Sequence, residues 1–270
     1  MNNSYPGARA KNISEVGKMP DVIYYAALII GWAVLGFIAF CALWILFLMV
    51  NAILIDPKKT YPNHSRYHRF ILNFSTLFAL PGAGIRLHVK GLENLPENTR
   101  FVVMGNHRSK FDPIITWHVL RKYDISYISK PENFKVFCFG RIIRRCCFLP
   151  INRSDPRESL KTLAKAAELI KDDKVSIGIY PEGTRSKTGE LLPFHDGTMK
   201  IAQMAKVPIV VVTLRGTENI KRNFPFKNTQ VYMDIIETIP ADFVTSNSSH
   251  VIAKRVRDDM EKILTANSNE

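Results

Sequence analysis

A long apolar segment stands near the start of the chain. Residues 22–55 contain no charged residue, whereas about 20 helical residues suffice to cross the roughly 30 Å hydrocarbon core of a bilayer. As one straight helix the segment would measure about 51 Å, so it predicts a helix that extends past the hydrocarbon, bends near Gly31 or Gly36, or enters and returns. A cleaved signal peptide would have an apolar region of only about 7–15 residues. The segment therefore predicts membrane attachment.

A second helical pattern, at residues 66–80, is amphipathic. Aromatic side chains recur on one face, and polar ones, among them Arg66 and Arg69, on the other. This distribution is typical of an interfacial helix whose bases meet lipid headgroups, and equally of a helix packed on its own domain. Pro81-Gly82 is expected to end the helix and to mark a domain boundary. Residues 22–84 are thus predicted to be membrane-attachment helices.

Beyond residue 84, short apolar runs alternate with helical patterns. The predicted strands are residues 85–90, 100–104, 125–129, 148–151, 175–180, 209–214 and 230–236, and the predicted helices are residues 113–121, 132–146, 156–171, 198–205 and 249–264. This alternation predicts an α/β domain over residues 85–264, with a mostly parallel central sheet flanked by helices. Residues 1–21 form a polar N-terminal segment, and residues 265–270 are expected to be a frayed tail.

The net charge of the chain limits the kinds of partner that it is expected to bind. The 270 residues carry 37 Lys and Arg against 24 Asp and Glu, a formal net charge of +13, which predicts an anionic partner such as nucleic acid, a phosphorylated substrate or an anionic membrane. Between residues 130 and 153 stand six bases and one acid, either a solvated face or an anion-binding face. A nucleic-acid binder would interleave bases with exposed aromatics, and the apolar segment argues against one.

Cysteine usage indicates a reducing compartment. The four cysteines, Cys41, Cys138, Cys146 and Cys147, form no CxxC pair and no pattern typical of a disulfide framework. No metal site is expected from them. The cytosol is therefore the expected environment of the folded domain.

The first chemical constellation, Asn106-His107-Arg108-Ser109-Lys110-Phe111-Asp112-Pro113, follows a predicted strand. Ligands bind at the carboxyl ends of strands in α/β sheets. Acyl transfer to a hydroxyl requires a base, most often histidine, and a carboxylate on the other ring nitrogen fixes its tautomer. His107 and Asp112 could form that pair, although Asp112 before Pro113 is also typical of a helix start without a catalytic role.

Two further blocks are of interest. The first follows a predicted strand, and the second is itself a predicted strand. Tyr180-Pro181-Glu182-Gly183-Thr184-Arg185-Ser186 combines a glycine, which permits close backbone approach, with an arginine, which binds phosphate as a bidentate fork. Taken alone, this block would more often be a glycine turn with a surface arginine. Val207-Pro208-Ile209-Val210-Val211-Val212 is typical of a buried strand.

Together these blocks resemble the glycerolipid acyltransferase family, most closely its 1-acylglycerol-3-phosphate acyltransferases. The family has a His-x4-Asp block, a Gly/Arg block, a Glu-Gly-Thr-Arg-Ser block and a proline-bearing apolar strand in that order. Here they are NHRSKFD, FGRIIRRCCFLPINR, PEGTRS and VPIVVV, within about residues 85–216. The second block is richer in Arg and Cys than expected, so only Arg153 is carried over from it. The fourth has Val211 where the family commonly has a second proline.

The resemblance implies a membrane-attached enzyme of phospholipid biosynthesis. His107 would take the proton from the hydroxyl of lysophosphatidic acid, which attacks an acyl thioester directly, with Asp112 orienting the imidazole and no covalent acyl-enzyme. Arg153, Glu182, Gly183, Thr184 and Arg185 would form the acceptor site. The expected co-substrate is acyl-CoA or acyl-carrier protein, with no cofactor or metal, at the cytoplasmic face of the cell membrane.

Two alternatives remain open from the sequence. Within the same chemistry the acceptor could be glycerol 3-phosphate or another lysolipid. A non-catalytic, membrane-tethered lipid-binding protein would be a different class, typically without His107 or Asp112, and both are present. The acyl chain and the oligomeric state have no signature in the sequence.

Overall fold

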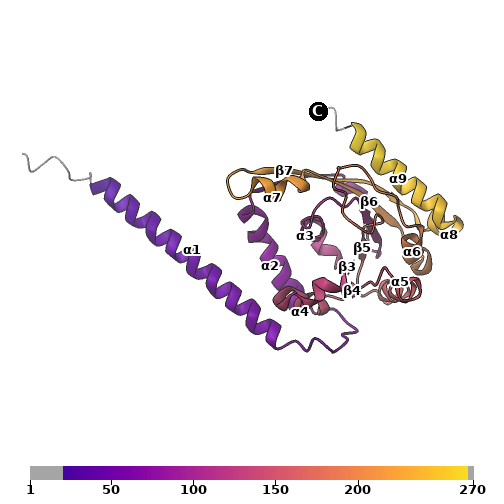
Figure 1. Cartoon of the computed structure of the whole chain (residues 1–270), viewed down its shortest axis with the longest axis horizontal. Helices are drawn as coiled ribbons and strands as arrows, with labels where there is room; N and C mark the ends of the chain where they lie inside the picture. Colours follow the sequence, from indigo (N-terminus) through magenta and orange to yellow (C-terminus); the bar gives the residue numbers. More distant parts are fainter. Residues whose placement is uncertain (1–20, 267–270) are drawn as a thin grey trace, which may run out of the picture. The chain divides into compact units, whose positions relative to one another are not determined.

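The computed structural model describes residues 21–266 and divides the chain at Ile53/Leu54 into two compact units. The predictions made for residues 1–20 and 267–270 lie outside the described residues. The second unit holds all the strands shown in Figure 1.

The first unit contains the apolar segment as the helix α1 (Asp21–Ile53). It continues through Gly31 and Gly36 without interruption (Figure 1), so the segment neither breaks at a glycine nor turns back. Its 33 residues would measure about 50 Å. Apolar side chains are exposed all along the helix, and by length and composition α1 could cross a membrane. A helix apolar on every side needs an apolar surrounding to be stable.

A seven-stranded sheet forms the centre of the second unit, in the order β1-β7-β6-β2-β5-β3-β4 among the described residues. Its strands are β1 (Ile85–Lys90), β2 (Val102–Gly105), β3 (Ser126–Ser129), β4 (Leu149–Pro150), β5 (Ile177–Ile179), β6 (Ile209–Arg215) and β7 (Thr229–Ile239). Each overlaps a predicted strand. All neighbours are parallel except β6 and β7, so the mostly parallel sheet is confirmed.

Alternating side chains of the strands fill two separate cores. In β2, Val102 and Met104 belong to one core and Val103 to the other, because successive side chains of a strand point to opposite faces. Helices cover both faces (Figure 1). The first core is closed by α5 (Pro156–Lys171), α6 (Lys200–Ala205), α8 (Ala241–Ser246) and α9 (Ser249–Ala266), and the second by α2 (Arg66–Gly82), α3 (Asp112–Val119) and α7 (Ile220–Asn223).

One predicted helix is divided in two, whereas another has the predicted ends. The helix expected at residues 132–146 is divided into a 3₁₀ turn, η4 (Pro131–Lys135), and α4 (Phe137–Arg144), because Val136 between them is extended. Its apolar spacing continues across the break, so the sequence pattern does not reveal it. The bounds of α5 match the prediction, since Asp155 caps the amides of residues 157 and 158 and Pro156 opens the first turn.

Helix α2 corrects the predicted domain boundary. It contacts α3 and β1 and lies within the compact unit that begins at Leu54, so Pro81-Gly82 is the end of the helix but not of the domain. Its buried face is mixed, with Ile71 and Leu80 beside Arg69, and the exposed face carries aromatic side chains, among them Tyr67 and Phe70. Helix α2 is therefore packed on the domain through apolar and polar side chains together, and it also presents an aromatic face to the outside.

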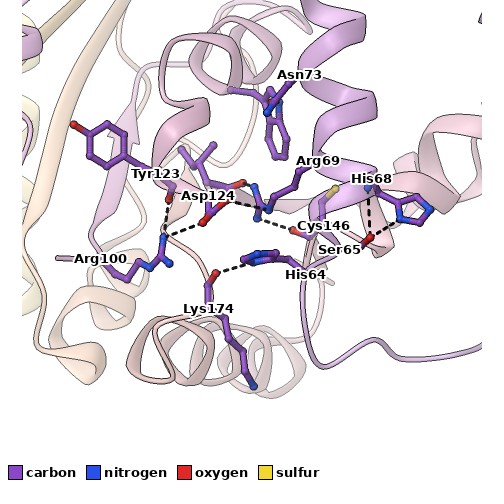
Figure 2. Close-up of polar contacts among 12 residues, drawn as sticks. His64, Ser65, His68, Arg69, Asn73, Arg100, Tyr123, Asp124, Cys146 and Lys174 are labelled. Atoms are coloured by element: carbon purple, nitrogen blue, oxygen red, sulfur yellow. Dashed lines mark hydrogen bonds and ion pairs between the residues drawn. The ribbon is translucent and has the colours of Figure 1, made fainter. Parts of the chain in front are cut away.

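Arg69 fixes α2 to the domain (Figure 2). Its side chain is only 5% exposed, and its guanidinium donates to the carbonyl oxygens of Ile125 at 2.8 Å and Cys146 at 3.3 Å. It lies 3.7 Å from the Asp124 carboxylate and stacks over the Trp117 ring at 5.1 Å. The expectation that this base meets lipid headgroups is therefore wrong, whereas Arg66 is exposed.

Replacing Arg69 by methionine should destabilise the folded protein by about 2–4 kcal/mol, because it leaves two buried carbonyls without a donor, while Asp124 keeps its ion pair with Arg100. Arg66→Met is the matched control on the same helix and should change stability by less than about 0.5 kcal/mol. Chemical unfolding followed by near-ultraviolet circular dichroism measures both. Equal stability of the two variants would show that the Arg69 contacts contribute nothing net.

Candidate active site

The loop between β2 and α3 brings His107 and Asp112 together. The Nδ1 atom of His107 lies 2.7 Å from Oδ2 of Asp112, and the carboxyl group is completely buried. An ionised carboxylate only accepts hydrogen bonds, so Nδ1 carries the proton and Nε2 is left with a free lone pair. His107 lines a pocket. The pair predicted from the sequence thus has the geometry of a general base and its orienting carboxylate.

The same carboxylate oxygen organises the whole loop. Oδ2 of Asp112 also accepts from the backbone amides of Arg108 at 2.6 Å and Ser109 at 2.7 Å. Asp112 is the first residue of α3, with Pro113 next, where a negative charge interacts favourably with the helix dipole. Phe111, and not Asp112, is the N-cap residue of α3, so the Asp112 side chain orients His107 and the loop instead of capping the helix.

Glu182 holds the backbone of His107 from the neighbouring strand. Its Oε1 accepts from the His107 amide at 2.6 Å and its Oε2 from the Leu192 amide at 3.0 Å. Burial raises the pKa of this carboxyl, and the two amide hydrogen bonds offset part of that rise. Glu182 is not among the residues that line the pocket. Glu182 therefore positions the loop that carries His107, and its contact with the acceptor stays a prediction.

Two further residues of the predicted blocks, to which the sequence assigned no role, support the base. The imidazole of His107 stacks on the Tyr180 ring, with centroids 4.3 Å apart and planes inclined by 17°. Asn106 exchanges hydrogen bonds of 2.9 and 2.7 Å with the carbonyl and amide of Leu214. Asn106 is the first residue of NHRSKFD, and Tyr180 directly precedes PEGTRS. Only their place next to these motifs could have indicated them.

A pocket of about 980 Å³ opens at this edge of the sheet. Its wall combines His107 with side chains of α2, α3, α4 and α5. Apolar groups such as Trp117, Phe148 and Leu163 form part of the lining, and cationic groups the other part. The cations are Lys110, Lys130, Arg153, Arg185 and Lys200. A cavity that is apolar and cationic suits an amphiphile with an anionic group.

Four of the five predicted acceptor residues meet in this pocket: Arg153, Gly183, Thr184 and Arg185. Gly183 has φ +66°, and a Cβ there would lie 2.9 Å from the His195 ring, so the turn requires glycine. The guanidinium of Arg153 donates to the Gly183 carbonyl. Arg185 is exposed and makes no hydrogen bond or ion pair within residues 21–266. Its fork is therefore available to a ligand.

The apolar fourth block takes no part in the pocket. Ile209, Val210, Val211 and Val212 are buried in β6, and they pack into the two cores on either face of the sheet. The valine that stands where the family commonly has proline continues the hydrogen-bonded strand, paired with both β2 and β7. Its role here is structural.

Known proteins resemble both the sequence and the fold. A family model described as Acyltransferase matches residues 86–215. The 1-acyl-sn-glycerol-3-phosphate acyltransferase alpha of Homo sapiens is 27% identical over 80% of this chain and 76% of its own length. The 1-acyl-sn-glycerol-3-phosphate acyltransferase of Borreliella burgdorferi is 29% identical over 67% of this chain and 73% of its own.

A solved structure shares the architecture. The crystal structure of the 1-acyl-sn-glycerophosphate (LPA) acyltransferase PlsC from Thermotoga maritima aligns with a TM-score of 0.64 and 22% identity, covering 83% of this chain and 88% of that one. The aligned share of the chain is larger than the 86–215 segment that the family model matches.

Proposed function

We propose that this chain, whose residues 86–215 match a family model described as Acyltransferase, transfers a fatty acyl group from a thioester to the free hydroxyl of 1-acylglycerol 3-phosphate, giving phosphatidic acid. The observation that carries the proposal is the His107–Asp112 pair, 2.7 Å apart, at the wall of a pocket with an apolar and a cationic part. The similar proteins named above are acyltransferases for this acceptor.

The reaction needs one proton carrier and no acyl-enzyme. Nε2 of His107 takes the proton of the acceptor hydroxyl as the oxygen forms a bond to the thioester carbonyl carbon. The tetrahedral intermediate then expels the thiolate, which takes the proton back from the imidazolium. Asp112 stabilises that imidazolium while it exists. Each cycle therefore leaves the enzyme unchanged.

The same proposal includes the acyl donor and the cellular location of the enzyme. An acyl-CoA or acyl-carrier protein thioester serves as co-substrate, and the reaction uses no metal and no bound cofactor. α1 anchors the enzyme in the cell membrane, with the second unit on the cytoplasmic face, where the lipid acceptor and product reside. Supporting this placement are the length and apolar composition of α1 and the net charge of +13, which favours an anionic leaflet.

The direct experiment is acyl transfer by the purified full chain in lipid vesicles, with labelled acyl-CoA and either lysophosphatidic acid or glycerol 3-phosphate. We expect phosphatidic acid from lysophosphatidic acid and little product from glycerol 3-phosphate. Preference for glycerol 3-phosphate would mean that the enzyme attaches the first acyl chain, to glycerol 3-phosphate, and not the second. Absence of transfer to either acceptor, with acyl-carrier protein tried as donor, would refute the proposal.

Arg185 tests which part of the pocket receives the phosphate. A charge-assisted hydrogen bond contributes roughly 1.5–3 kcal/mol, so Arg185→Ala should reduce kcat/KM for lysophosphatidic acid about 10- to 150-fold. Arg185→Lys keeps the charge but not the bidentate fork, so its kcat/KM should lie between the values of the unmodified protein and Arg185→Ala. Steady-state kinetics with each substrate varied separately measure these effects.

Lys187 provides the matched control for Arg185, because it is an exposed base of the same loop that does not line the pocket. Lys187→Ala should leave kcat/KM nearly unchanged. For Arg185→Ala, the loss should shrink with an acceptor analogue that lacks the phosphate, while KM for the acyl donor stays constant. Equal damage to donor and acceptor kinetics, together with a lower melting temperature, would mean that Arg185 stabilises the loop instead.

A further inference from the structure

Two hydrogen bonds hold residues 184–190, a mostly exposed segment of the pocket loop, against the loop of the base. Ser186 donates its backbone amide to the carbonyl oxygen of His107 at 2.8 Å. The guanidinium of Arg108 donates to the carbonyl oxygen of Gly189 at 2.6 Å. In the part of the chain that the structure describes, no other hydrogen bond joins residues 184–190 to the rest of the protein. These two contacts therefore decide where the segment lies relative to the base.

Arg108 makes its contact from outside the pocket. Its side chain is 14% exposed and is not part of the pocket lining. Its other terminal nitrogen lies 3.3 Å from the carboxylate of Glu218. Within the segment, the hydroxyl oxygen of Ser186 accepts from the Gly189 amide at 3.1 Å, which closes the turn between them. A single backbone hydrogen bond at Ser186 would let the segment swing, and the contact between Arg108 and Gly189 adds a second fixed point three residues on.

This arrangement links the base and the phosphate-binding arginine by a short stretch of backbone. Arg185 directly precedes Ser186, whose amide is bonded to His107 itself. A fixed path of this kind sets the separation between the hydroxyl that loses its proton and the phosphate of the same acceptor. In 1-acylglycerol 3-phosphate the free hydroxyl is on C2, beside the carbon that carries the phosphate. In the 2-acyl isomer it is on C1, further away by one carbon–carbon bond of about 1.5 Å.

We propose that Arg108 is a positioning residue that makes the enzyme selective for the hydroxyl on C2. Through the Gly189 carbonyl it keeps Arg185 at the separation from His107 that fits 1-acylglycerol 3-phosphate and not its isomer. A misplacement of about 1 Å can cost about 10²-fold in rate, so a segment that moves by one carbon–carbon bond no longer distinguishes the two acceptors. The selectivity rests on the function proposed above, whereas the hold on the segment rests on the geometry alone.

Three variants of the full chain separate the contacts of Arg108. Arg108→Met removes every donor, and Arg108→Lys keeps the charge but loses the planar fork. Glu218→Gln is the matched control, because it removes the ion pair and leaves the bond to Gly189, and exposed ion pairs contribute little. The acceptors are 1-O-alkyl- and 2-O-alkylglycerol 3-phosphate, since an ether-linked chain cannot migrate between hydroxyls. The value of kcat/KM for each acceptor is measured in vesicles with labelled acyl-CoA.

We expect Arg108→Met to lower kcat/KM for the 1-O-alkyl acceptor about tenfold, as a displacement of less than about 1 Å predicts, and to leave that for the 2-O-alkyl acceptor unchanged or higher. The ratio of the two values then falls about tenfold or more. Arg108→Lys should give an intermediate ratio, and Glu218→Gln the ratio of the unmodified protein. An equal loss with both acceptors would overturn the proposal, because a merely structural role lowers both alike. An unchanged ratio would overturn it as well.

Trypsin tests the hold on the segment without any turnover. Arg185 and Lys187 are exposed, and cleavage after them requires the segment to leave its place. Arg108→Met should raise the initial rate of cleavage at these two residues about threefold to tenfold, as loss of one hydrogen bond predicts. Glu218→Gln should not raise it. Equal rates in Arg108→Met and the unmodified protein would overturn the proposal. Faster cleavage in a protein that transfers no acyl group would instead refute the proposed function and confirm the hold on the segment.

Discussion

Replacement of His107 by alanine should lower kcat for acyl transfer by about 10²–10⁴-fold, the usual contribution of a positioned general base. The free lone pair on Nε2 is lost, and the acceptor hydroxyl must then lose its proton to water. KM values should change little, because the pocket wall around the imidazole stays in place. Radiolabelled acyl transfer in vesicles, under single-turnover and steady-state conditions, measures the effect.

His195 supplies the control for this variant. It also lines the pocket, and it is exposed, so His195→Ala should retain kcat within a fewfold of the unmodified protein. Both variants should remain membrane-bound through α1. Near-normal turnover in purified His107→Ala protein would refute the mechanism, because no other pocket histidine lies at the end of β2 with a buried carboxylate behind it.

Asp112→Asn should lower kcat by about 10²–10⁴-fold while the protein stays folded. The asparagine oxygen can still accept from the amides of Arg108 and Ser109, which bind Oδ2 in the unmodified protein. Its NH₂ group, however, donates to Nδ1 of His107 in some conformers, which moves the ring proton to Nε2 and removes the base. In other conformers the NH₂ takes the place of Oδ1, which is buried without a hydrogen bond from residues 21–266.

The double variant His107→Ala/Asp112→Asn separates orientation from an independent role of Asp112. If the carboxylate acts only through the imidazole, the double variant is no slower than His107→Ala, because residues that act as a unit are strongly non-additive. Glu218→Gln is the matched control, since Glu218 pairs with Arg108 of the same loop at 3.3 Å and is exposed. Multiplicative losses in the double variant would assign Asp112 a separate function.

Strands and the catalytic pair could be predicted because their signals are local. β6 begins with an unbroken run of β-branched residues, Ile209–Thr213, all of them buried, and such runs are typical of strands covered on both faces. His107 and Asp112 lie within one turn of each other, so their spacing in sequence carries over to space. The short helices α7 and α8 were not predicted, because four and six residues are too few to establish a helical period.

The partners of Arg69 and Glu182 could not be predicted, because both residues bind backbone atoms far away in sequence. Arg69 binds carbonyls that lie 56 and 77 residues further on, and Glu182 binds an amide 75 residues before it. Backbone atoms are the same at every position, so no sequence pattern marks them as partners. A charged residue on a helical polar face is most often solvated, and this expectation fails for Arg69.

Hydrogen bonds to backbone atoms hold the loop that carries His107. Placement of the base therefore does not depend on the side chains that line the pocket, and each can change independently in evolution. Asn106 is bound to the backbone of Leu214, and Ser186 donates its backbone amide to the carbonyl of His107 at 2.8 Å. Such contacts persist when the side chains of the partner strands change. If the acyl chain binds at the apolar wall of Trp117, Phe148 and Leu163, substitutions there can change the preferred chain length while these backbone contacts still hold the base. An enzyme of this design can acquire a new chain preference through single steps that each remain active.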